Sequence, residues 1–190
     1  MENKIDILRK KAAKGNKWAR KRLIKLLLPK AKSGDPKAQY ELSTLFNLSS
    51  KTEKEMIYWL TASAEQGYPD AQRNLAWCYA IGDGVPKSKS TALYWFTKAA
   101  EQNDREAQFA VASAYYLGDG VDKDINKVIY WCTKAAENDH IEAQCNLAEL
   151  FEKGEEIEQN TEKAIYWYTK AKEQGSDCAA EALSRLANKS

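Results

Sequence analysis

The chain has 190 residues, of which 44% are hydrophobic and 29% are charged. This composition supplies a buried core and excludes a disordered polar chain. Four prolines and nine glycines are too few for an all-β fold with many tight turns, and no apolar run is long enough to cross a bilayer. The first residues lack the apolar core of a secretory signal, so we expect a cytoplasmic protein.

The N-terminal segment, residues 1–35, predicts two basic helices over 3–14 and 16–32 that act as a divergent cap. Residues 1–37 hold 13 Lys/Arg against 3 Asp/Glu, although the whole chain has a formal net charge of only +2. The basic patch consists of Lys10, Lys11, Lys14, Lys17, Arg20, Lys21 and Arg22.

Three interpretations of this patch stay open. The plainest is a solvated cationic face on a capping helix. The patch could also contact an acidic partner protein or the acidic end of a second copy. Nucleic acid or membrane is less favoured, because Trp18 is the one aromatic residue among the cations and no recognition motif surrounds them. We therefore expect no nucleic-acid and no membrane partner.

An internal repeat governs the rest of the chain. The pair Ala-Gln occurs at 38–39, 71–72, 107–108 and 143–144, and the pair Tyr-Trp occurs at 58–59, 94–95, 130–131 and 166–167. The Tyr-Trp spacing is 36 residues each time. A fixed period of this length indicates stacked helix pairs. We divide residues 36–176 into repeats 36–68, 69–104, 105–140 and 141–176, followed by a capping helix within 177–190.

Each repeat predicts two helices. In the second copy Ala71, Leu75 and Tyr79 recur every four residues, which places them on one buried face of the first helix. Gly-x-Gly then ends that helix, although Ser49-Ser50 replaces it in the first copy. The second helix carries the Tyr-Trp pair, which we interpret as structural because it recurs with the fold.

The recurring pattern Ala-Gln-x-x-Leu-Ala-x-x-Tyr-x-x-Gly-x-Gly-Val, followed by Ala-x-x-Trp-x-x-Lys-Ala-Ala-Glu, resembles the Sel1-like repeat, a relative of the tetratricopeptide repeat. The resemblance implies an all-α, right-handed superhelical solenoid of helix-turn-helix repeats. It also implies a non-catalytic adaptor or scaffold, of a kind common in bacteria, that holds a partner protein in its concave groove.

Two narrower functions follow from the same resemblance. One is an immunity protein that neutralises a bacterial toxin or effector by direct binding. The other is a hydrolase like the cysteine-rich relatives linked to β-lactams. Those relatives have cysteines at fixed positions in each repeat, whereas Cys78, Cys132, Cys145 and Cys178 fall at unrelated positions. We therefore disfavour the hydrolase and expect free thiols in a reducing compartment.

The candidate binding residues lie opposite the buried stripe of each first helix and differ from copy to copy. They are Tyr40, Thr44, Arg73, Trp77, Phe109, Ser113, Tyr116, Glu149 and Glu152. Exposed aromatic and Arg side chains are typical anchors of protein interfaces. The alternative is that Trp77 and Phe109 fill gaps between neighbouring helices.

The sequence predicts no catalytic residue, no metal site and no cofactor. His140 is the one histidine in the chain. It falls in a predicted loop, where we expect it to be exposed to solvent. The expected partner is another protein, and the chain itself is expected to be a monomer or a weak dimer. A purely assembly role, with basic ends docking on acidic bodies, is a third possibility that sedimentation at low and high salt would test.

Overall fold

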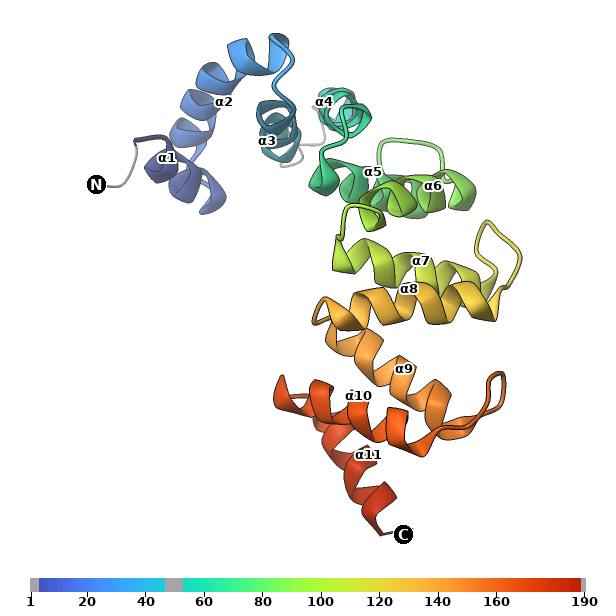
Figure 1. The fold of residues 1–190 in the computed structure, drawn as a ribbon. Helices are drawn as coiled ribbons and strands as arrows, with labels where there is room; N and C mark the ends of the chain where they lie inside the picture. The colour runs from blue at the N-terminus through green and yellow to red at the C-terminus, as the bar shows by residue number, and fades with distance from the viewer. Residues whose placement is uncertain (1–3, 47–52, 189–190) are drawn as a thin grey trace. The chain divides into compact units, whose positions relative to one another are not determined.

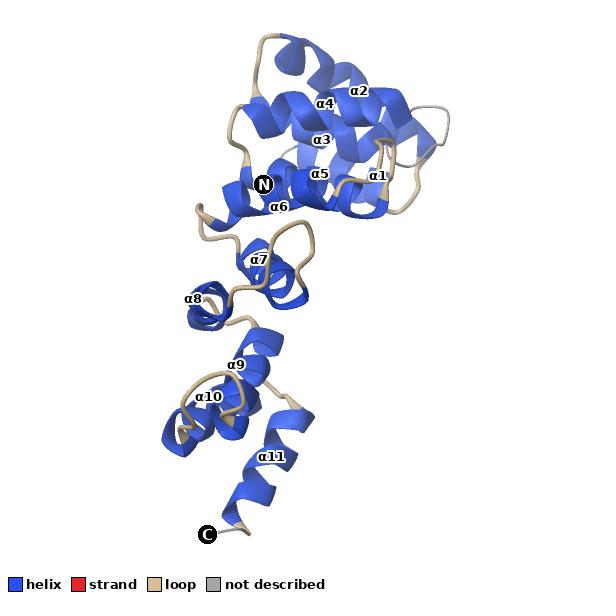
Figure 2. Ribbon diagram, turned by 90° about the vertical axis from the view of Figure 1, so that its right-hand side faces the viewer, coloured by secondary structure: helices blue, strands red, loops and turns tan. Residues whose placement is uncertain are grey.

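The computed structural model describes residues 4–46 and 53–188, and every regular element within these ranges is an α-helix (Figure 2). The chain forms two compact units, the first ending at Ser88 and the second beginning at Lys89. This division falls between the two helices of the predicted repeat 69–104. The turn expected at Ser49-Ser50 lies outside the described residues.

The first unit contains the two basic helices, both helices of the first repeat and the first helix of the second repeat. Its elements are α1 (Lys4–Ala13), α2 (Lys17–Lys32), α3 (Pro36–Phe46), α4 (Glu53–Glu65) and α5 (Pro69–Ile81) (Figure 1). Within the unit each helix packs mainly on its neighbours in sequence. The core includes Leu23 and Leu27 of α2 and Leu42 of α3, all buried, as the predicted stripe requires.

One ion pair joins α1, in the N-terminal cap, to α3, in the first repeat. The Arg9 guanidinium on α1 donates two hydrogen bonds from Nη2, of 2.7 and 3.0 Å, to the two carboxylate oxygens of Glu41 on α3. Arg9 Nε adds a third, of 3.1 Å. This forked contact joins residues 32 positions apart, so the cap is docked on the first repeat.

The second unit is a series of six helices. They are α6 (Lys89–Ala100), α7 (Arg105–Leu117), α8 (Ile125–Glu137), α9 (Ile141–Lys153), α10 (Thr161–Glu173) and α11 (Asp177–Ala187) (Figure 1). Again each packs chiefly on its neighbours in sequence. Fully buried alanines such as Ala107 and Ala143 let the helix backbones approach closely, and Val111 and Leu147 fill the space beside them.

The Ala-Gln motif has a structural purpose that its alanine alone does not explain. The four recurring glutamines are buried, and each donates from Nε2 to the carbonyl of the residue eight positions earlier, at 3.0–3.1 Å. Gln144, for example, donates to Ala136 at the end of α8. Because the last carbonyls of a helix have no partner within it, this bond joins the first helix of each repeat to the helix that precedes it.

The Tyr-Trp pairs correct one expectation, because only the tryptophan of each pair belongs to the core. Trp59 is buried and Trp131 is half-buried, whereas Tyr58 and Tyr130 are exposed. In all four pairs the tyrosine ring stands edge-on to its tryptophan, at 4.9–5.1 Å between ring centres. Adjacent residues in a helix point about 100° apart, so the two rings do not share a buried face.

Glycine sets the turn after the first helix of a repeat, as the sequence predicts. Gly118 has φ 75° and ends α7 in the left-handed conformation. Gly120 has φ 76°, and a side-chain carbon there would lie 2.6 Å from the backbone of Lys89 and Ser90 at the start of α6. The second glycine is therefore required by a close approach between backbones as well as by the turn.

Candidate partner-binding cleft

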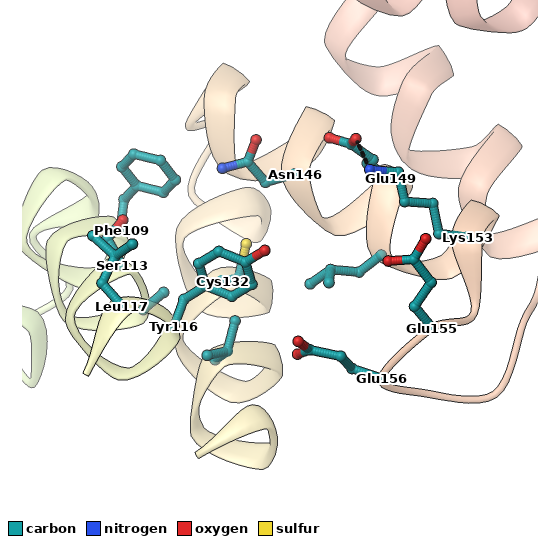
Figure 3. A pocket seen from close by; sticks show the side chains of 13 residues that line it. Phe109, Ser113, Tyr116, Leu117, Cys132, Asn146, Glu149, Lys153, Glu155 and Glu156 are labelled. Carbon is teal, nitrogen blue, oxygen red and sulfur yellow. Dashed lines mark ion pairs between the residues drawn. The ribbon is translucent and has the colours of Figure 1, made fainter. Parts of the chain in front are cut away.

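A cleft of about 270 Å³ opens in the second unit, between α7, α8, α9 and the loop that follows α9 (Figure 3). Its floor is mainly apolar and its rim carries charged side chains. The lining residues are Phe109, Ala112, Ser113, Tyr116, Leu117, Val128, Cys132, Asn146, Glu149, Leu150, Lys153, Glu155 and Glu156. The volume lies just below the ~300–1,000 Å³ of common small-molecule sites, so one large side chain is a better match than a cofactor.

Four of the predicted binding residues meet in this cleft. Phe109, Ser113 and Tyr116 come from one face of α7, because they are spaced four and three residues apart. Glu149 reaches the cleft from α9. Tyr116 is 50% exposed, so its side chain is partly accessible to a partner. The sequence therefore predicts a group of side chains that the fold does place together.

Phe109 has a second contact, with His140, and this corrects the expectation that His140 is exposed. The two rings are stacked with centres 4.5 Å apart. His140 is only 7% exposed and is the N-cap of α9, where its Nδ1 accepts the Ala143 backbone N–H at 3.2 Å. Its Nε2 lies 3.4 Å from a carboxylate oxygen of Glu106.

The position of His140 in the repeat gives the physical reason for its burial. Asp104, 36 residues earlier, and Ser176, 36 residues later, cap α7 and α11 with their own side chains. Histidine also offers an acceptor nitrogen, so it substitutes for these N-cap residues. Its ring then covers Phe109, so Phe109 both fills a gap between helices and lines the cleft.

The rim of the cleft is acidic. Residues 142–162 hold seven Glu and one Lys. The lysine, Lys153, pairs with Glu149 at 2.6 Å, and this hydrogen bond is the main reason that the pKa of Lys153 is raised. Glu155 and Glu156 extend from the loop after α9 toward the cleft (Figure 3). The rim therefore attracts cations.

Cys132 lies on the cleft floor but is poorly suited to be a nucleophile. Burial raises the pKa of its thiol to about 12, and Sγ donates to the Ala143 carbonyl at 3.3 Å. None of the described residues that line the cleft is a histidine that could remove its proton. The thiol therefore stays protonated at neutral pH.

Glu152 does not line the cleft, although the sequence predicts it on the binding face. Its carboxylate accepts from Arg185 on α11, at 2.7 and 2.9 Å, and from the Tyr168 hydroxyl on α10, at 3.0 Å. Burial, followed by this bond to Glu152, raises the pKa of Tyr168. Glu152 therefore connects three helices and is held away from a partner.

The remaining predicted binding residues belong to the first unit and divide between two environments. Thr44 and Trp77 line a more open cleft there, with Met56 and Leu60 on its floor. Tyr40 instead packs against Tyr68, with the two rings tilted by 40° and 5.2 Å between their centres, and accepts a hydrogen bond from Asn74. Arg73 pairs with Asp70 at 2.7 Å.

The basic patch lies on α1, α2 and the turn between them. All its residues are exposed except Arg20, which is half-buried. Trp18, at the start of α2, is 67% exposed, the same fraction as Ile81 and the highest among the large hydrophobic side chains of the described residues.

Sequence reasoning missed the floor of the cleft and half of its rim. Leu117 and Leu150 lie next to predicted positions in sequence, but which of them faces the cleft depends on how α7 and α9 pack. Glu155 and Glu156 occupy a loop whose path is not periodic. The one sequence feature that indicates an acidic rim is the density of Glu around Gly154. Gly154 is the residue at which α9 ends, with φ 66°.

Two further searches cover the described part of the chain. Within residues 4–46 and 53–188, no group of three or more His, Cys, Asp or Glu side chains is placed to hold a metal ion. In the same ranges, none of the helices has the length and apolar character that crossing a membrane requires.

The family model described as the Sel1 repeat matches residues 57–68, 69–104, 105–140 and 141–176, which is more than half of the chain. The match begins inside the first predicted repeat, within its second helix α4. No curated protein matches the sequence.

Solved structures give the same fold. A protective antigen of uropathogenic Escherichia coli is 31% identical with a TM-score of 0.80, and the match covers 86% of this chain and 36% of that one. A Sel1 repeat protein from Oxalobacter formigenes is 28% identical with a TM-score of 0.80, over 87% of this chain and 49% of that one. Cysteine rich protein B of Helicobacter pylori, 20% identical with a TM-score of 0.55 over 70% of this chain and 97% of that one, shares the fold alone.

The chain thus spans about a third to a half of the length of the first two of these proteins. Proteins built from Sel1 repeats are generally modules that bind other proteins. The all-helical fold expected from the sequence is confirmed by the matching repeats and by these structures.

Proposed function

Because the chain belongs to the Sel1 repeat family, we propose that it is a non-catalytic adaptor that seats an apolar side chain of a partner protein in the cleft between α7, α8 and α9. The observation that carries this proposal is the chemistry of the cleft. It has an apolar floor of the size of one large side chain, a half-exposed aromatic ring at its mouth, and carboxylates around its rim. Such a site matches a buried anchor with polar surroundings.

The same chemistry describes the partner's segment. An apolar residue would enter the cleft, and Lys or Arg beside it would face Glu155 and Glu156. Opposite charges at the rim raise the rate of association and select the orientation, while the apolar anchor supplies most of the affinity. The protonated thiol of Cys132 also favours binding over nucleophilic catalysis at this site.

The test uses the full chain as bait, with cleft variants and a matched control. Tyr116→Ala removes the ring at the mouth, and Glu155→Lys reverses charge at the rim. Tyr130→Ala is the control, because Tyr130 is also exposed and does not line the cleft. We expect a partner captured from the native host to be lost with both cleft variants and kept with the control.

The captured partner is then purified and its affinity for each variant is measured by calorimetry. Tyr116→Ala should weaken binding about tenfold or more, while changing the free energy of unfolding by less than about 0.5 kcal/mol. Equal affinity for the unaltered chain and both cleft variants would overturn the proposal. If the partner is a toxin and the chain rescues poisoned cells, the narrower role of an immunity protein follows. A cytoplasmic location stays a prediction.

A further inference from the structure

The chain carries a surface whose chemistry complements its own cleft. On α2, the residues Trp18, Arg22, Lys25 and Leu26 share one face, because they are spaced at helical intervals of four, seven and eight residues. All four are exposed. This surface, the α2 face, lies beside the buried stripe of Ala19, Leu23 and Leu27, about 100° around the helix.

The α2 face combines an aromatic anchor with positive charge. Trp18 is 67% exposed, and tryptophan and arginine are the residue types enriched among interface anchors. Residues 10–32 hold ten Lys/Arg and no Asp or Glu. The α2 face is therefore an aromatic anchor, with the leucine side chain two turns away, inside a strongly cationic surface.

The cleft between α7, α8 and α9 has the opposite properties. Its floor accepts one large apolar side chain, and its rim carries Glu155 and Glu156 within the segment 142–162, where seven Glu stand against one Lys. The α2 face belongs to the first unit and the cleft belongs to the second.

We propose that the α2 face of one copy occupies this cleft in a second copy, with Trp18 as the anchor and Arg22 and Lys25 facing the glutamates of the rim. This inference rests on the proposed function, since it names the occupant of the same cleft. The partner protein of the proposed function can still bind the cleft, but the α2 face of a second copy competes with it for the same cleft. The contact is heterologous, because each copy offers two different surfaces.

Salt dependence and concentration dependence test the proposal first. The full chain is sedimented over a range of concentrations in about 10 mM and about 1 M salt, where the Debye length falls from about 30 Å to about 3 Å. We expect the sedimentation coefficient to rise with concentration at low salt and to stay at the monomer value at high salt. A monomer under all conditions would overturn the proposal.

Charge reversal then identifies the two surfaces. Arg22→Glu with Lys25→Glu, or Glu155→Lys with Glu156→Lys, should each abolish self-association, and mixing the two double variants should restore association between them. Trp18→Ala should weaken self-association about tenfold or more. Tyr58→Ala is the control, because Tyr58 is 64% exposed and belongs to neither surface.

Each further outcome has a meaning. Self-association that survives Trp18→Ala and both charge reversals would refute the assignment of surfaces. Binding of Trp18 to anionic lipid vesicles by a chain that never self-associates would show that the α2 face serves a membrane. If self-association is absent but cleft variants still lose the captured partner, this inference fails while the proposed function stands. Circular dichroism confirms that every variant is folded.

Discussion

The buried glutamine of each repeat offers a test of how neighbouring helices are joined. Gln144 is 1% exposed, donates from Nε2 to the Ala136 carbonyl at 3.0 Å, and accepts from Gln174 Nε2 at 2.9 Å. Replacing it with leucine of similar size removes both hydrogen bonds. Each such bond contributes about 1 kcal/mol net, so two predict a loss of about 2 kcal/mol.

The surroundings limit that loss. The Ala136 carbonyl still accepts the Asp139 backbone N–H, at 3.2 Å, and Gln174 is exposed and can turn to water. No buried group is left without a partner, and leucine adds apolar contact. We therefore expect Gln144→Leu to lower the free energy of unfolding by about 1–2 kcal/mol.

Gln144→Glu makes the test sharper. A carboxylate in this place would face the Ala136 carbonyl oxygen with no cation beside it, so we expect a loss of about 3 kcal/mol or more at pH 7. Burial raises the pKa of such a carboxyl, and its protonated form can donate to the carbonyl again. Because the folded-state pKa is the higher one, the deficit should shrink as the pH falls through it.

Urea unfolding followed by circular dichroism measures these changes. Glu181→Leu is the control, since Glu181 is exposed on α11. It should change stability by less than about 0.5 kcal/mol. If Gln144→Leu is as harmless as the control, and Gln144→Glu shows no pH dependence, the glutamine bond does not join the helices.

Three further predictions concern the caps, the turns and the thiols. His140→Ala should cost about 1–2 kcal/mol in thermal unfolding, and His140→Asp should recover much of that loss because aspartate also caps a helix; equal losses would argue against the cap. Gly120→Ala should cost about 2 kcal/mol or more, and Gly175→Ala less, because a side-chain carbon at Gly175 meets open space; chemical unfolding should show this order. Iodoacetamide at pH 8 should alkylate exposed Cys178 first and buried Cys132 last, and mass spectrometry of tryptic peptides would reveal the reverse order if the burial is wrong.

The repeat could be predicted from the sequence because its period is visible in residues that must be buried. Ala71 and Leu75 recur at helical spacing, and the structure buries both fully. The role of Gln72 could not be predicted in this way, because its partner is a carbonyl of the previous helix. That contact depends on where the helix ends and not on the pattern within it.

The candidate site was predictable only in part, for a similar reason. Helical phase places Phe109, Ser113 and Tyr116 on one face, and they do line one cleft. The same phase places Glu152 near Glu149, yet Arg185 on α11 draws Glu152 into a contact among helices. The position of a residue in the helical repeat determines the direction in which its side chain points. Whether that side chain can contact another protein also depends on residues two helices away, such as Arg185.

The packing of every described helix chiefly on its sequence neighbours has a consequence for how the chain can change over time. Most contacts join residues within a few dozen positions, so forming them closes only short loops, and folding can begin in any pair of neighbouring helices that pack on each other. A whole repeat of 36 residues could be gained or lost while disturbing only its interfaces with the two repeats beside it. Duplication and deletion of such units would therefore alter the binding surface without requiring a new core.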